Sequence, residues 1–223
     1  MAQDKAQPPQ PAPPDDKDRL ASYGISPDQT LAEPVIVPPD KVLTLSALDG
    51  AGKRGYVQLK PKTMDDVKLW IGVHDEIARR RTVAHLAPAN IPHVQNAAEL
   101  KQLPTADLRG LHNLAETFVH GDSRQVAQFT PAFQLLLKDA VIHGIFVRAD
   151  IDVYGVLDIH NSVRLLWANR IRIWGNGKIR FHGPAKIDAT SIEGKHKLVH
   201  FPSEILNAVS SIGILKTLEV QHG

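Results

Sequence analysis

Residues 169–190 decide the fold, and they read Asn-Arg-Ile-Arg-Ile-Trp-Gly-Asn (169–176), Gly-Lys-Ile-Arg-Phe-His-Gly-Pro (177–184) and Ala-Lys-Ile-Asp-Ala-Thr (185–190). One phrase of eight residues recurs three times, with apolar and charged positions alternating inside it. Alternation with a period of two is typical of β-strands that bury one face. The three phrases therefore predict three short strands that carry charged side chains on their outer face.

The same period extends toward the N-terminus and begins near Ile145. Its apolar positions before the phrases are Ile151, Val153, Leu157, Ile159, Val163 and Leu165. Two architectures fit this pattern. An antiparallel β-meander would use Gly175-Asn176 or Gly183-Pro184 as hairpin turns. A short right-handed parallel β-solenoid would stack nearly identical phrases, and the likeness of the phrases favours it.

The chain divides into five parts by composition and period. Residues 1–33 are rich in proline and polar residues and predict a disordered tail. Residues 34–60 predict short strands that start the β-solenoid, and residues 142–200 predict its repeats. Residues 61–141 predict an inserted helical block, with helices beginning at Thr63, Thr105 and Thr130. Residues 201–223 predict a C-terminal cap of one helix and one strand. The expected fold class is thus mixed α+β.

Composition sets broad limits on function. The chain has 223 residues, a net charge of +2 and no cysteine, so it lacks a disulfide framework and a thiol nucleophile. No apolar run is long enough to span a bilayer, and the first residues lack the apolar core of a signal peptide. We expect a cytoplasmic protein, with export that needs no cleavable signal as the alternative.

Charged side chains change sign along the outer face of the predicted strands. Acidic positions come first, at Asp150, Asp152 and Asp158, and they form an acidic complementary patch. Basic and aromatic positions follow, and they predict a binding face: Arg170, Arg172, Trp174, Lys178, Arg180, His182 and Lys186. Stacked cations repel one another, so solvent, an anionic partner or the acidic patch of a second copy must offset them.

Candidates for chemistry are few. The three aspartates could act as paired carboxylates on a glycan, but general acid catalysis needs a raised pKa and these positions are expected to be solvated. His196 and His200 are read as surface histidines, so no metal site and no cofactor are expected. If the protein acts on or binds a glycan, the aspartates and the aromatic residues Trp167 and Trp174 would form its site.

The sequence therefore predicts a non-enzymatic structural or interaction protein. It would act through self-association into an oligomer or polymer, or by binding an anionic partner such as a glycan, a nucleic acid or an acidic surface. The alternative is a glycan-binding or glycan-cleaving β-solenoid protein.

Overall fold

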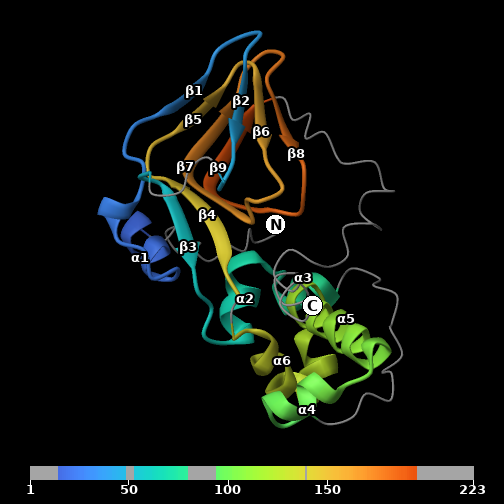
Figure 1. Ribbon diagram of the computed structural model, residues 1–223. Helices are drawn as coiled ribbons and strands as arrows, with labels where there is room; N and C mark the ends of the chain where they lie inside the picture. The colour runs from blue at the N-terminus through green and yellow to red at the C-terminus, as the bar shows by residue number, and fades with distance from the viewer. Residues whose placement is uncertain (1–14, 49–52, 80–93, 139, 195–223) are drawn as a thin grey trace, which may run out of the picture.

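The computed structural model describes residues 15–48, 53–79, 94–138 and 140–194, which form a mixed α/β fold (Figure 1). The strands gather in one half of the molecule and α2–α6 in the other. The strands are β1 (Val35–Val37), β2 (Val42–Leu45), β3 (Tyr56–Leu59), β4 (Ile142–Val147), β5 (Ile151–Val153), β6 (Val156–Ile159), β7 (Leu165–Ile173), β8 (Lys178–Phe181) and β9 (Lys186–Gly194). The helices are α1 (Asp16–Ala21), η1 (Pro27–Gln29), α2 (Met64–Ile71), α3 (Asp75–Arg79), α4 (Ala97–Gln102), α5 (Thr105–His120), η2 (Ser123–Phe129) and α6 (Thr130–Leu136).

A six-stranded sheet contains β1, β5, β7, β4, β3 and β9. Its centre is β7, a strand of nine residues. One edge of β7 pairs with β4 and then with β5, and its other edge pairs with β9, all in parallel. The outermost pair on the β4 side, β3 with β4, is antiparallel. The sheet is therefore mostly parallel, with β9 at one side and β1 and β3 at the other.

A three-stranded parallel sheet, in the order β2-β6-β8, faces the six-stranded sheet across an apolar core. Middle positions of this core, such as Ile151, Leu157, Ile171 and Ile179, are fully buried. Burial of each such side chain stabilises the fold by about 1.5–3 kcal/mol. This shared core holds the two sheets together.

The β-solenoid predicted from the eight-residue phrases is wrong, because the chain forms two separate sheets that include an antiparallel pair. Successive phrases fall on β7, β8 and β9, which alternate between the sheets. Ile171 pairs with Ile151 and not with Ile179, the matching position of the next phrase. The meander is wrong as well, since β5, β6 and β9 pair in parallel with their neighbours.

A tight turn explains why the phrases separate. After β7, the Gly177 N–H donates to the Trp174 carbonyl at 2.8 Å, and the turn passes the chain to the other sheet. A Cβ on Gly177 would collide with the Val153 carbonyl, so only glycine fits this close approach. The turn therefore changes the sheet and does not reverse the chain within one.

The helices between β3 and β4 pack on the six-stranded sheet through a second core, which includes Phe133, Phe146 and Trp167. Helices begin at the expected places. Thr63 caps α2 by accepting from the Asp66 N–H, and α5 ends before Gly121. The apolar spacing that begins after Thr63 continues to Ala78, but α2 ends at Ile71 with Gly72 as its C-cap, and the Val73 N–H then bonds to the Val119 carbonyl.

Two further differences concern the ends of the chain. The sequence predicts only a disordered tail in residues 1–33, whereas α1 lies within them and its Leu20 is buried. Arg19 of α1 reaches β9 and donates to Asp188 at 2.9 Å. The predicted cap at residues 201–223 lies outside the described residues. None of the helices in the described part of the chain combines the length and apolarity that crossing a bilayer requires.

Candidate functional site

The predicted acidic and basic residues are neighbours on adjacent strands. Asp152 of β5 is the register partner of Arg172 of β7, and Asp158 of β6 is the register partner of Arg180 of β8. Both pairs point away from the core between the sheets. The sequence placed these side chains correctly on outer faces, but it did not reveal that each aspartate lies beside an arginine.

Each of these arginines binds an aspartate of the same chain. Arg170 Nη2 donates to Asp150 Oδ2 at 2.7 Å, and Arg172 Nη2 donates to Asp152 Oδ2 at 2.8 Å. Arg180 donates to both carboxylate oxygens of Asp158. Glu193 of β9 continues the pattern, with an oxygen 4.0 Å from Arg170. Acidic and basic residues thus alternate from strand to strand. We call this set of contacts the ion-pair ladder: Asp150–Arg170, Asp152–Arg172, Asp158–Arg180 and Glu193 beside Arg170.

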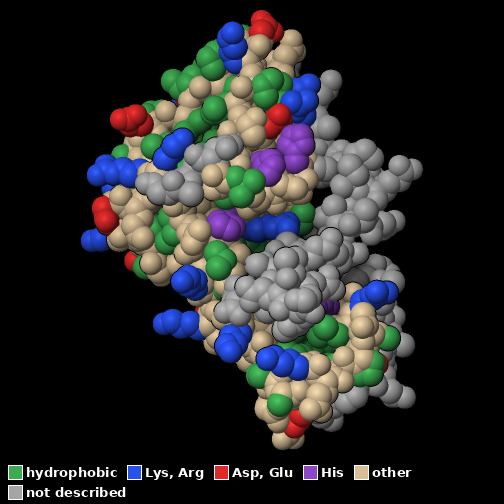
Figure 2. Space-filling view, viewed as in Figure 1, with side chains coloured by type: hydrophobic (Ala, Val, Ile, Leu, Met, Phe, Trp, Pro, Cys, Tyr) green, Lys and Arg blue, Asp and Glu red, His purple; other side chains and the backbone are tan. Residues whose placement is uncertain are grey.

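The ion-pair ladder gives the surface a different charge distribution from the one that the sequence suggested. The sequence suggested a gradient from an acidic to a basic region, which a second copy could complement. In the structure the opposite charges neutralise one another within one molecule. Figure 2 agrees, since basic and acidic side chains are interspersed over the sheet-bearing half of the face shown. The ladder therefore needs no external anion to offset repulsion between its arginines.

Electrostatics also argues against the aspartates as general acids. The hydrogen bond from Arg180 holds the pKa of Asp158 below its ordinary value, although partial burial opposes this. Partial burial by itself raises the pKa of Asp152, but hydrogen bonds from Trp174 and Arg172 outweigh it and leave the pKa lowered. A carboxyl with a lowered pKa is ionised at neutral pH and cannot donate the proton that glycoside cleavage requires.

The other predicted basic residues do not join one patch. Lys186 turns toward the helices, where its Nζ donates to the Leu69 carbonyl at 2.7 Å, and partial burial lowers its pKa. His182 Nε2 lies 3.6 Å from Asp158 Oδ2. Lys178 makes no ion pair with any residue that the structure describes. The predicted binding face is thus divided among three environments.

Trp174 lies beside an aromatic residue that the sequence analysis missed. Its ring stacks on Tyr154, with the ring centres 6.0 Å apart and the planes inclined by 13°. Both rings are well exposed, at 44% for Trp174 and 41% for Tyr154. Trp167, the other aromatic position of the predicted glycan site, is fully buried in the helix-covered core. A glycan site that uses both tryptophans is therefore wrong.

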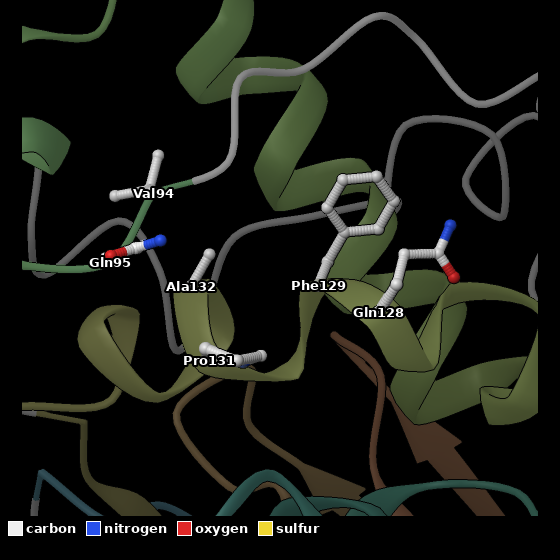
Figure 3. Close-up of a pocket in the computed structure, with 6 residues that line it drawn as sticks. All are labelled: Val94, Gln95, Gln128, Phe129, Pro131 and Ala132. Carbon is white, nitrogen blue, oxygen red and sulfur yellow. The ribbon is translucent and has the colours of Figure 1, made fainter.

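A small depression of about 110 Å³ lies among the helices (Figure 3). Its lining comes from the segment before α4, from η2 and from α6: Val94, Gln95, Gln128, Phe129, Pro131 and Ala132. None of these side chains is charged. Among the described residues no cluster of histidine and acidic side chains could hold a metal ion, and His196 and His200 lie outside them. The depression offers no group for catalysis.

The two ends of the sheet pair provide a different kind of site. The core between the sheets is only half-buried at both of its ends. One end contains Val35 of β1 and Leu43 of β2, and the other contains Phe181 of β8 and Ile187 of β9. At the β1 and β2 end, Ile36 and Val42 are 59% and 58% exposed. Apolar surface and strand edges thus coincide at each end.

Comparison of the chain with protein-family models, with curated proteins and with solved structures gives no match.

Proposed function

We propose that this is a non-enzymatic protein that self-associates by adding the β8–β9 end of one copy to the β1–β2 end of another. One observation carries the proposal. β9 pairs with β7 along its whole length, from Leu165↔Lys186 to Ile173↔Gly194, and its other edge has no strand partner among the described residues. An unpaired parallel edge of nine residues is a template for a further strand.

The free edge of β9 offers backbone groups in the necessary direction. The Lys186 N–H donates to the Arg164 carbonyl at 2.9 Å and therefore points toward β7. Because these directions alternate along a strand, the N–H groups of Ile187 and Ala189 point toward the free edge. A second copy can accept these bonds.

The half-buried ends of the core support the same arrangement. A copy added at β9 would cover Phe181 and Ile187 with the apolar side chains of its own β1 and β2, and its exposed Ile36 would lie beside Glu193 on the outer face of the continued sheet. The apolar area lost from water would add to the backbone hydrogen bonds.

The direction of addition follows from the topology. The two ends carry different strands, so one copy contacts the next head to tail and not through the same surface. Contacts of this kind generate open polymers unless the rotation closes a ring. We therefore propose a concentration-dependent series of oligomers.

Binding of an anionic partner is less well supported as the main function. The arginines of the ion-pair ladder already bind Asp150, Asp152 and Asp158, so a polyanion would have to displace these contacts. A cytoplasmic location belongs to the proposal, with signal-less export as the alternative. Cell fractionation with an epitope-tagged chain distinguishes the two.

The test uses a proline at the free edge. In Ala189→Pro the residue loses an N–H that points away from β7, so the fold is kept while strand addition is blocked. Ala189→Val keeps the N–H and is the matched control. Sedimentation velocity should show oligomers for the natural chain and for Ala189→Val, and monomers for Ala189→Pro at equal helix and strand content. Monomers of the natural chain at every concentration would contradict the proposal.

A further inference from the structure

An exposed pair of stacked aromatic rings is unusual on a protein surface, because each ring keeps a large apolar area in water. Tyr154 follows β5 directly and Trp174 follows β7, so the register of the sheet brings the two residues side by side. Stacking on one another covers one face of each ring. The 44% exposure of Trp174 leaves much of its surface open to solvent.

Polar contacts fix the orientation of Trp174. Its Nε1 donates to Asp152 Oδ1 at 2.9 Å, while Asp152 also accepts from Arg172. The guanidinium carbon of Arg172 lies 6.0 Å from the centre of the Trp174 ring. The indole is thus held by a hydrogen bond and an adjacent cation, and it is preorganised as a contact surface.

Hydrogen-bonding groups of both kinds lie next to the rings. Asp152 and Arg172 contact Trp174 itself, and Glu193 lies in register with Arg172. The pair of Asp150 and Arg170 follows on the same face, one outward position further from the rings. Three carboxylates and two guanidinium groups therefore lie on this part of the surface, with a net charge of −1. Such a cluster favours a neutral ligand over a polyanion, because the carboxylates repel phosphate or sulfate.

We propose that Tyr154 and Trp174 form a stacking platform for a neutral sugar ring, whose hydroxyl groups bind the carboxylates and guanidinium groups beside it. A pyranose presents an apolar C–H face that packs on an aromatic ring and a rim of hydroxyls that both donate and accept. Rings joined by equatorial β-1,4 linkages keep these faces flat and accessible. A platform without a deep pocket predicts a dissociation constant of about 1 mM.

Fluorescence offers a selective probe, since the chain has 3 tryptophans. Trp70 and Trp167 are 8% and 0% exposed, so a soluble quencher such as acrylamide reaches mainly Trp174. Cellohexaose or chitohexaose should lower the quenching constant by about half when it covers the ring. Retardation in native gels that contain hydroxyethylcellulose extends the assay to variants without Trp174.

Trp174→Ala and Tyr154→Ala should abolish retardation, whereas Trp174→Phe and Tyr154→Phe keep an aromatic face and should remain retarded. Unchanged thermal unfolding would show that the alanine variants are folded. The proposal is overturned by an unchanged quenching constant with both oligosaccharides, or by retardation that survives Trp174→Ala. It is also overturned if oligothymidine protects Trp174 from acrylamide as well as the oligosaccharides do. Protection of Trp174 from acrylamide that grows with protein concentration in the absence of sugar would also overturn the proposal, because a second copy would then cover the rings. Ala189→Pro should bind sugar like the natural chain, which separates this proposal from self-association.

Discussion

Arg180 and Asp158 face each other on neighbouring parallel strands, with Arg180 Nε 2.6 Å from Asp158 Oδ1 and Nη2 2.8 Å from Asp158 Oδ2. The two planar groups match one another as a bidentate pair, the strongest geometry for an ion pair. Asp158 is only 7% exposed, and its contact with Arg180 joins two strands of the three-stranded sheet.

Asp158→Asn keeps the shape of the side chain but removes its charge and one acceptor, so one guanidinium N–H loses its partner. We expect the midpoint of thermal unfolding to fall by about 2–4 °C. Lys178→Gln removes a cation from the same strand as Arg180 and is the matched control. A fall of the same size in both variants would show that general charge, and not the pair, determines the effect.

The pH dependence of stability follows from the same carboxylates. The pKa values of Asp152 and Asp158 lie below their ordinary values in the folded chain. A lowered pKa stabilises the fold above the unfolded-state value of about 3.9, and this stabilisation is lost as the pH falls through the folded-state value. Thermal unfolding between pH 7 and pH 3 should therefore show a decline below about pH 4 that is shallower in Asp158→Asn. An equal slope in both proteins would contradict this assignment.

The strands could be located from the sequence because their signal is local. Short runs of β-branched and apolar residues, bounded by turn or loop residues, indicate strands at 35–37, 42–45 and 56–59, where β1, β2 and β3 lie. The pairing of the strands could not be predicted, because it depends on the turns. The phrases recur every eight residues, whereas Ile171 pairs with Ile151 at an offset of 20 and Ile179 pairs with Leu157 at an offset of 22.

The long offset between paired strands also explains why the ion pairs of the candidate site could not be predicted from the sequence. Asp152 and Arg172 are 20 residues apart in sequence, so their ion pair becomes visible only when the register is known. The aromatic pair does have a signal in the sequence. Tyr154-Gly155 and Trp174-Gly175 are two aromatic–glycine steps at the same offset of 20. Burial of Trp167 depends on the helices that cover its face of the sheet, which alternation alone does not reveal.

Lys68 connects α2 to the C-terminal end of α5. Its Nζ donates to the carbonyls of Phe118 and Gly121 at 2.7 and 2.8 Å and lies 2.9 Å from Asp75 Oδ1. Lys68→Met keeps the apolar stem but leaves two helix-terminal carbonyls and a carboxylate without the cation. We expect the free energy of unfolding to fall by about 2 kcal/mol, measured by denaturant titration. Lys62→Met, at an exposed position before α2, should change it by less than about 0.5 kcal/mol.

Tyr23 and Arg19 fasten the N-terminal helical segment to β9 through Asp188, to which the Tyr23 hydroxyl donates at 2.5 Å. Burial, with the neighbouring carboxylate, raises the pKa of Tyr23 above its ordinary value. Tyr23→Phe removes the hydroxyl that donates to Asp188 and should lower the free energy of unfolding by about 1 kcal/mol. Amide hydrogen exchange should quicken in α1 and β9 and stay unchanged in α5. Uniform quickening would indicate a general loss of stability.

Head-to-tail addition can be tested directly, because the chain has no cysteine. Continuing the register of the six-stranded sheet places Ile36 of an added copy opposite Glu193, whose row follows Asp152 and Arg172. Ile36→Cys and Glu193→Cys, made in separate chains of different mass and mixed under mild oxidation, should therefore form mainly the mixed disulfide dimer. Equal amounts of mixed and like dimers, or no dimers at concentrations where the natural chain associates, would contradict the account.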